Sequence, residues 1–246
     1  MCWHDWRMLP IDCAFYLGNL RGNVSSKCDH WGSPINWNLA LSLYGTLYGA
    51  IEMRVFVIYA HPSEDSFTFH AKNSFIKGLE KSGHHVIVSD LYKMGFQTDM
   101  SEAEYLRESN YIETLSPPYD VLAEQEKIND SDALVFIYPV FWTEAPAKLV
   151  GWFNRVWTYG FAYGSRTMKK LDKALVIAIT GHSIENLKKY NHLQSMQTVM
   201  LGDRLHDRVT EKSMIIFDSM TKSNQEDRNA NWEKHIETAY QLGVTF

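Results

Sequence analysis

The chain has 246 residues, of which 45% are hydrophobic and 22% charged, and this balance is typical of a globular protein with a sizeable core. Its net charge is -5 and no stretch is rich in Lys or Arg, which argues against a nucleic-acid-binding protein. All three cysteines lie at or before Cys28, so disulfides cannot form the framework of the rest of the chain. A cysteine-free main domain fits a reducing cytoplasm, where we expect the protein to act.

The sequence changes character at Glu52-Met53. Residues 1–52 contain half of the tryptophans and show no sustained period of two or of 3.6 residues. We expect them to form an N-terminal extension that is disordered or not native, with Met53 as the natural start. A targeting or docking segment is the alternative. The charge-free stretch 35–51 is too short and too polar for us to expect a membrane span.

From Met53 onward, strand and helix patterns alternate along the chain. The apolar, β-branched runs predict strands over 54–60, 85–90, 133–139, 173–180 and 213–218. Helices are predicted over 66–81, 119–129, 146–157, 184–200 and 225–242, with an irregular or helical excursion over 91–118. Five buried strands alternating with helices predict an α/β domain over 53–246, a flavodoxin-like doubly wound parallel sheet in the order 2-1-3-4-5.

In such a sheet, ligands bind beyond the carboxyl ends of the strands, here at the loops after the first, third and fourth. The first of these loops ends at a helix N-terminus, where free N–H groups and the helix dipole attract phosphate. We expect His61, Ser63, Ser66 and Thr68 to add hydrogen-bond donors. The alternative is that Ser66 is only an N-cap and His61 only a turn residue.

The loop after the third strand carries large apolar side chains where small polar residues normally serve. Val140, Phe141 and Trp142 follow the strand directly and predict a slot for a flat heteroaromatic ring. The alternative interpretation is that Trp142 fills the core.

The loop after the fourth strand reads Thr180-Gly181-His182. Gly181 would allow close approach of a ligand to the backbone, with Thr180 and His182 as polar contacts. The sequence has no GxGxxG, GxxxxGK[ST], HExxH or GxSxG motif. Because no nucleophile or metal site stands out, we expect a bound cofactor to carry the chemistry.

At these loops the chain resembles the NAD(P)H:quinone oxidoreductase family of flavoproteins. The matching runs are His61-Pro-x-x-x-Ser66-Phe67, Asp90-Leu-Tyr92, Val121-Leu-Ala-Glu-Gln125, Tyr138-Pro-x-x-Trp142-x-x-x-Pro146-Ala-x-Leu-x-Gly-Trp-x-x-Arg155-Val156 and Phe161-Ala-Tyr163. The likeness covers about 53–246, is weaker after Thr180, and does not extend to residues 1–52.

The resemblance implies a homodimer that holds one FAD, or FMN, per subunit at the dimer boundary and uses NAD(P)H as co-substrate. It implies that the flavin phosphates and ribityl chain are held by His61, Ser66, Phe67 and Thr68. It implies that the isoalloxazine is held by Pro139, Val140, Phe141, Trp142 and Thr143, with its polar edge at Thr180 and Gly181. Tyr163 would line the pocket of the neighbouring subunit.

The sequence also departs from the family pattern. The second position of the family's double glycine is His182, and Leu187 stands where many members have a charge-relay tyrosine. Tyr190 and His192 could replace the charge-relay pair only after a loop shift. The candidates for catalytic residues are therefore Tyr163, Tyr190 and His192.

The helix predicted over 146–157 has an apolar face, formed by Leu149, Trp152, Phe153, Val156 and Trp157. Such a face fits a dimer contact and equally a helix that faces the core. The acidic residue that contacts the partner subunit in family members is Asn154 here.

The function that we expect from the resemblance is ping-pong hydride transfer from NAD(P)H, through flavin N5, to a quinone or similar small acceptor. We expect no metal site and no nucleic-acid partner. The alternative is a flavin- or nucleotide-binding regulatory subunit of a potassium-efflux type transport system, which the chain also resembles. An electron-carrier flavodoxin fits less well, because such carriers are usually more acidic than a net charge of -5.

Overall fold

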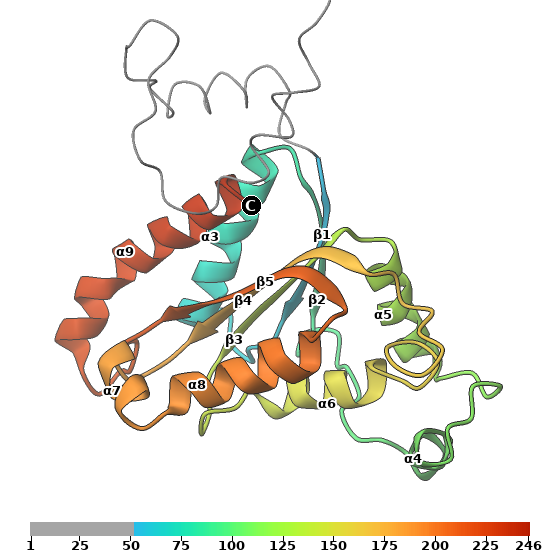
Figure 1. Cartoon of the computed structure of the whole chain (residues 1–246). Helices are drawn as coiled ribbons and strands as arrows, with labels where there is room; N and C mark the ends of the chain where they lie inside the picture. The colour runs from blue at the N-terminus through green and yellow to red at the C-terminus, as the bar shows by residue number, and fades with distance from the viewer. Residues whose placement is uncertain (1–51) are drawn as a thin grey trace, which may run out of the picture. The chain divides into compact units, whose positions relative to one another are not determined.

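A computed structural model describes residues 52–246, so the predicted N-terminal extension lies outside the described residues apart from Glu52. The described part contains a five-stranded sheet in which every neighbouring pair is parallel (Figure 1). Its strands are β1 Arg54–Tyr59, β2 His85–Asp90, β3 Ala133–Pro139, β4 Leu171–Ile179 and β5 Val209–Phe217. The order is β2-β1-β3-β4-β5, which confirms the predicted topology.

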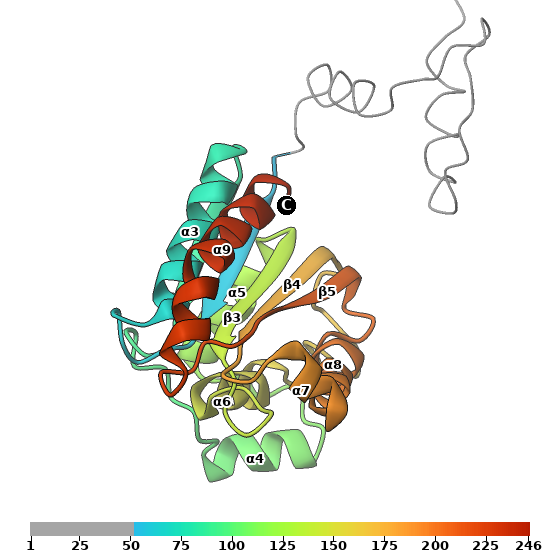
Figure 2. The same cartoon turned by 90° about the vertical axis from the view of Figure 1, so that its left-hand side faces the viewer.

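Helices cover both faces of this sheet. They are α3 Phe67–Lys81, α4 Glu102–Ser109, α5 Tyr119–Asn129, α6 Ala147–Val156, α7 Ile184–Lys189, α8 His192–Gln197, the π-helix η1 Thr198–Leu205 and α9 Gln225–Val244. Helices α3 and α9 pack side by side on one face (Figure 2). Helices α5, α6 and η1 contribute to the core on the other face. Within residues 52–246, no helix combines the length and apolarity needed to cross a membrane.

The two cores follow from the alternation of side chains along each strand. Val55 and Val57 of β1 pack toward α3 and α9, whereas Phe56 and Ile58 pack toward α6. Both sets are fully buried, so the strands are continuously apolar, as the sequence predicted. The apolar face of α6 belongs to the second core, which confirms the core-facing interpretation and leaves that face unable to support a dimer.

Two buried polar clusters fix the helices on the α6 side. Glu124 of α5 is fully buried and accepts hydrogen bonds from Trp152 Nε1 at 2.8 Å and Ser89 Oγ at 2.9 Å. Arg155 of α6 is also buried and pairs with Glu104 of α4 at 2.7 Å and Asp120 of α5 at 2.5 Å. Because a buried charge is costly unless it is paired, these contacts hold α4, α5 and α6 in one arrangement.

The structure corrects one part of the predicted element map and refines another. The single helix predicted over 184–200 is wrong, because Asn191 adopts a left-handed conformation (φ 58°) that separates α7 from α8. The excursion over 91–118 contains α4, which begins with a capping box between Ser101 and Glu104. That Ser-x-x-Glu pattern is readable in the sequence and could have predicted the helix start.

Helices α3 and α9 cross closely at two glycines. A Cβ at Gly78 would lie 2.2 Å from the carbonyl oxygen of Tyr240, and one at Gly243 would lie 2.2 Å from that of Phe75. We expect Gly78→Ala to lower the free energy of unfolding by about 1–3 kcal/mol, because the backbones of α3 and α9 must separate. Denaturant unfolding measures this. In the control Gly202→Ala, the new Cβ meets no described atom within 4 Å. Equal free energies of unfolding for the parent, Gly78→Ala and Gly202→Ala would contradict the close crossing of α3 and α9.

Stability should also fall in mild acid. Burial lowers the pKa of His84 and of His235, and His235 stacks on Phe217 with ring centroids 4.9 Å apart. The folded state thus favours neutral imidazole, and the unfolded chain binds more protons once the pH drops below about 6.5. The stabilisation that comes from keeping these imidazoles neutral is present above about pH 6.5. It is lost as the pH falls through the lowered pKa values of the two histidines in the folded state. Urea midpoints should therefore decrease between about pH 7.5 and about pH 5; a constant midpoint would contradict this.

Candidate functional site

A cleft of about 480 Å³ lies beyond the carboxyl ends of the strands, a volume in the range of small-molecule sites. Four loops and the start of α9 line it. The lining residues are His61, Ser63, Asp65, Ser66, Phe67, Thr68, Pro139, Val140, Phe141, Ile179, Thr180, Gly181, Met220, Thr221, Lys222 and Arg228. The three loops predicted from the sequence therefore do meet in one place.

The loop after β1 leads to the N-terminus of α3. Ser66 is the N-cap, and its Oγ accepts a hydrogen bond from Phe69 N at 3.1 Å, while the residue also lines the cleft. His61 Nδ1 lies 2.9 Å from Ser63 N, and burial lowers the pKa of His61. The ring is therefore neutral near pH 7. The loop offers an anion the positive end of a 15-residue helix.

The loop after β3 forms a tight turn at the edge of the cleft. Phe141 and Glu144 exchange backbone hydrogen bonds of 2.8 and 2.9 Å, and the two central residues have positive φ, 52° at Trp142 and 67° at Thr143. Trp142 is 100% exposed, so the interpretation that it fills the core is wrong. Phe141 lines the cleft, whereas Trp142 and Thr143 are not among its lining residues. Residues held in disfavoured backbone regions cluster at functional sites.

The loop after β4 passes close to the loop after β5. Thr180 is buried and its Oγ1 donates to the carbonyl oxygen of His182 at 2.9 Å. A Cβ at Gly181 would lie 3.2 Å from Thr221 Cβ, so the predicted close approach is made by the protein itself. His182 does not line the cleft; it lines a neighbouring hollow of about 260 Å³ that shares Gly181 and Thr221 with it.

The sequence-based prediction missed the contribution of the loop after β5 and of α9. Lys222 and Arg228 bring two cationic side chains to the cleft. Arg228 lies over the ring of Trp232 at 4.5 Å, and its Nε is buried without a hydrogen-bond partner among the described residues. The signal was available, because β5 ends at the same edge as the other parallel strands.

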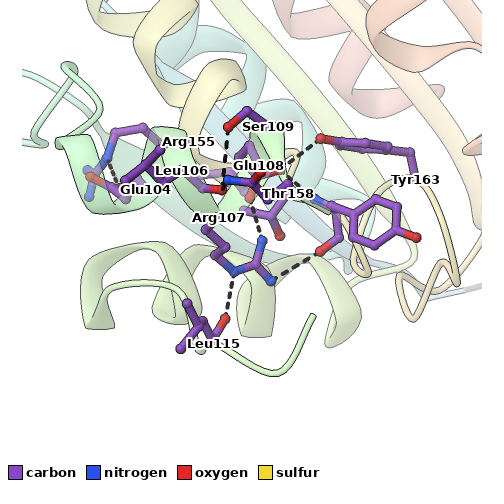
Figure 3. A network of polar contacts seen from close by, with 12 residues as sticks. Glu104, Leu106, Arg107, Glu108, Ser109, Leu115, Arg155, Thr158 and Tyr163 are labelled. Atoms are coloured by element: carbon purple, nitrogen blue, oxygen red, sulfur yellow. Dashed lines mark hydrogen bonds and ion pairs between the residues drawn. The ribbon is translucent and has the colours of Figure 1, made fainter. Parts of the chain in front are cut away.

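The three predicted catalytic residues lie apart from this cleft. Tyr163 donates its hydroxyl to Glu108 at 2.8 Å, and Glu108 pairs with Arg107 (Figure 3). Burial and the Glu108 carboxylate raise the pKa of Tyr163, so its phenol stays protonated. Tyr190 and His192 flank the break between α7 and α8, with ring centroids 5.8 Å apart. Within the described part of the chain, none of these three residues lines the cleft.

Comparisons with known proteins agree with the observed fold. The family model described as "Flavodoxin-like fold" matches residues 53–237. A solved structure, the NAD(P)H:quinone oxidoreductase from Methanothermobacter marburgensis, is 40% identical, has a TM-score of 0.71, and covers 78% of this chain and 97% of its own.

Two curated proteins are also similar. NAD(P)H dehydrogenase [quinone] 1 from Cavia porcellus is 32% identical over 166 residues, 60% of each chain. Ribosyldihydronicotinamide dehydrogenase-like protein traD from Penicillium crustosum is 36% identical over 125 residues, 46% of each chain. The chain thus spans about half the length of these curated relatives. With the family match covering all five strands, the chain belongs to the flavodoxin-like fold family, in the group that contains the NAD(P)H:quinone oxidoreductases.

Proposed function

We propose that this protein is a flavin-dependent NAD(P)H oxidoreductase that passes a hydride to a quinone or a similar small acceptor. One observation carries the proposal: a single cleft at the edge of the sheet combines a phosphate-binding end with an apolar wall. The phosphate-binding end would be formed by the N-terminus of α3 and the cations Lys222 and Arg228, and the apolar wall by residues 139–141. That combination suits a nucleotide whose other end is a flat ring.

The residues favour FAD over FMN. Arg228 has a buried Nε without a partner among the described residues, which a phosphate oxygen would satisfy. The helix N-terminus at Ser66 supplies donors to a phosphate from a different element. The hollow beside the cleft, which His182 lines, offers further room. Two phosphate-binding groups and an adjoining hollow fit a dinucleotide better than a mononucleotide.

The chain's own residues would bind and orient the ring and exclude water from it. Bound flavin supplies the capacity to accept and pass on a hydride at N5. Pro139, Val140 and Phe141 would hold the apolar face of the ring. The backbone N–H groups of Trp142 and Thr143 would stabilise negative charge that develops beside them. NAD(P)H and the acceptor would use the same slot in turn.

A homodimer would complete the slot. Large apolar side chains are exposed along residues 105–119, among them Tyr105, Leu106, Tyr111 and Leu115, and Tyr119 is 86% exposed. Contiguous exposed apolar surface commonly marks an interaction site. A second copy would cover it and bring Tyr163 to the neighbouring cleft. The charge-relay roles of Tyr190 and His192, and action in the cytoplasm, stay predictions.

The direct test is uptake and reduction of flavin by the full-length protein. We expect the purified protein to show, alone or after incubation with FAD, the visible absorption of bound flavin. NAD(P)H without oxygen should bleach this absorption, and a quinone should restore it. Binding without bleaching would favour the regulatory-subunit alternative, and a protein that takes up neither FAD nor FMN would refute the proposal.

Arg228→Gln should weaken retention of FAD by about tenfold, which corresponds to about 1.4 kcal/mol, because a cation at the phosphate end is lost. Riboflavin, which has no phosphate, should bind the variant as it binds the parent. Fluorescence titration of both ligands measures the difference. Lys234→Gln is the matched control, since it removes a cation from the same helix at an exposed position outside the cleft lining. An equal loss for riboflavin would contradict the assigned role.

A further inference from the structure

The turn at Phe141–Glu144 adopts a conformation that its own residues disfavour. Both central residues, Trp142 and Thr143, have positive φ, as a type I′ turn requires. Glycine and asparagine favour that region, whereas a bulky residue and a β-branched residue are disfavoured there. Such a turn persists only when contacts outside it hold it in place.

Glu144 provides the contact that reaches outside the turn. Its Oε1 accepts hydrogen bonds from Ala145 N at 2.7 Å and from Arg204 Nη1 at 3.1 Å. The Glu144 side chain is 44% exposed, whereas that of Arg204 is only 12% exposed. The turn is therefore tied, through its last residue, to a cation that lies mostly inside the protein.

Arg204 is in turn fixed by its surroundings. Its guanidinium lies over the ring of Phe153 of α6 at 4.7 Å, and its Nη1 is 3.3 Å from Met200 Sδ. Its carbonyl oxygen accepts a hydrogen bond from Trp157 Nε1 at 2.7 Å. A guanidinium held on several sides offers the Glu144 carboxylate a fixed partner and restricts where the turn can move.

The backbone around Arg204 is itself unusual. Arg204 is the next-to-last residue of the π-helix η1, which continues from α8 (orange in Figure 1). In a π-helix each N–H bonds the carbonyl five residues earlier, so later side chains point in directions that an α-helix would not give them. Such segments are rare and frequently occur at functional sites.

We infer that Arg204 is a positioning residue for the proposed flavin site: through Glu144 it holds the strained turn, and with it the Phe141 side chain on the cleft wall. The restraint that Arg204 places on the turn through Glu144 depends only on contacts within the chain. Its effect on flavin rests on the proposed function. The segment responsible lies more than 50 residues from the turn in sequence, since 204 and 144 differ by 60 positions.

The hold on the turn can be tested in full-length protein freed of flavin. Arg204→Gln should speed hydrogen exchange in peptides that contain the amides of Phe141 and Glu144, because their mutual hydrogen bonds open more often. Arg204→Lys should restore slow exchange in part. The control Arg166→Gln removes a different arginine–carboxylate pair, with Asp207, which does not line the cleft. Unchanged exchange in Arg204→Gln would overturn the inference.

A second variant keeps the test specific to backbone strain. Gly adopts positive φ freely, so Thr143→Gly should relieve part of the backbone strain in the turn that the Arg204–Glu144 pair holds in place. The effect of Arg204→Gln on exchange should then be smaller in the Thr143→Gly background than in the parent. Equal effects in both backgrounds would show that Arg204 does not act on the strained turn.

The consequence for flavin is measured by titrating FAD and recording its visible spectrum. Arg204→Gln should weaken FAD binding by about tenfold and shift the flavin absorption maxima, while the urea midpoint changes little. If the unaltered protein binds FAD and Arg204→Gln binds it with the same Kd and spectrum, the inference fails and the proposed function stands. If the unaltered protein takes up neither FAD nor FMN, the proposed function fails, and hydrogen exchange alone decides whether Arg204 holds the turn.

Discussion

Both faces of the parallel sheet must be buried, and the rest of the structure depends on that constraint. Alternate side chains of β1, β3 and β4 enter two separate cores, so helices are required on both sides. The loops at the carboxyl ends are then the part of the sheet that stays open to a ligand. Four of them meet in one cleft, where the N-terminus of α3, two cationic side chains and an apolar wall come from loops that follow different strands.

Polar contacts far apart in the sequence determine how accurately that cleft is built. Arg155 joins α4 and α5 to α6, and α6 follows directly on the turn that borders the cleft. Arg204 joins η1 to the same turn through Glu144. The apolar cores thus give the general shape, and a few partly or fully buried ion pairs fix the position of one wall of the cleft.

The sequence was enough to predict the fold and most of the cleft, because both follow from local patterns. Apolar runs marked the five strands, and parallel topology brought three predicted loops together. It could not predict features set by tertiary contacts. The left-handed Asn191, the π-helix and the positive φ of Trp142 and Thr143 have no periodic signature. Nor could it predict that Tyr163 donates its hydroxyl to Glu108, 55 positions away in the sequence.

The proposed function requires that the cleft beyond the carboxyl ends of the strands holds a flavin. A crystal structure of the full-length protein grown with FAD tests it most directly. We expect the isoalloxazine against residues 139–141 and the diphosphate between the N-terminus of α3 and Arg228. FAD bound elsewhere on the molecule, or an empty cleft at a saturating FAD concentration, would contradict it.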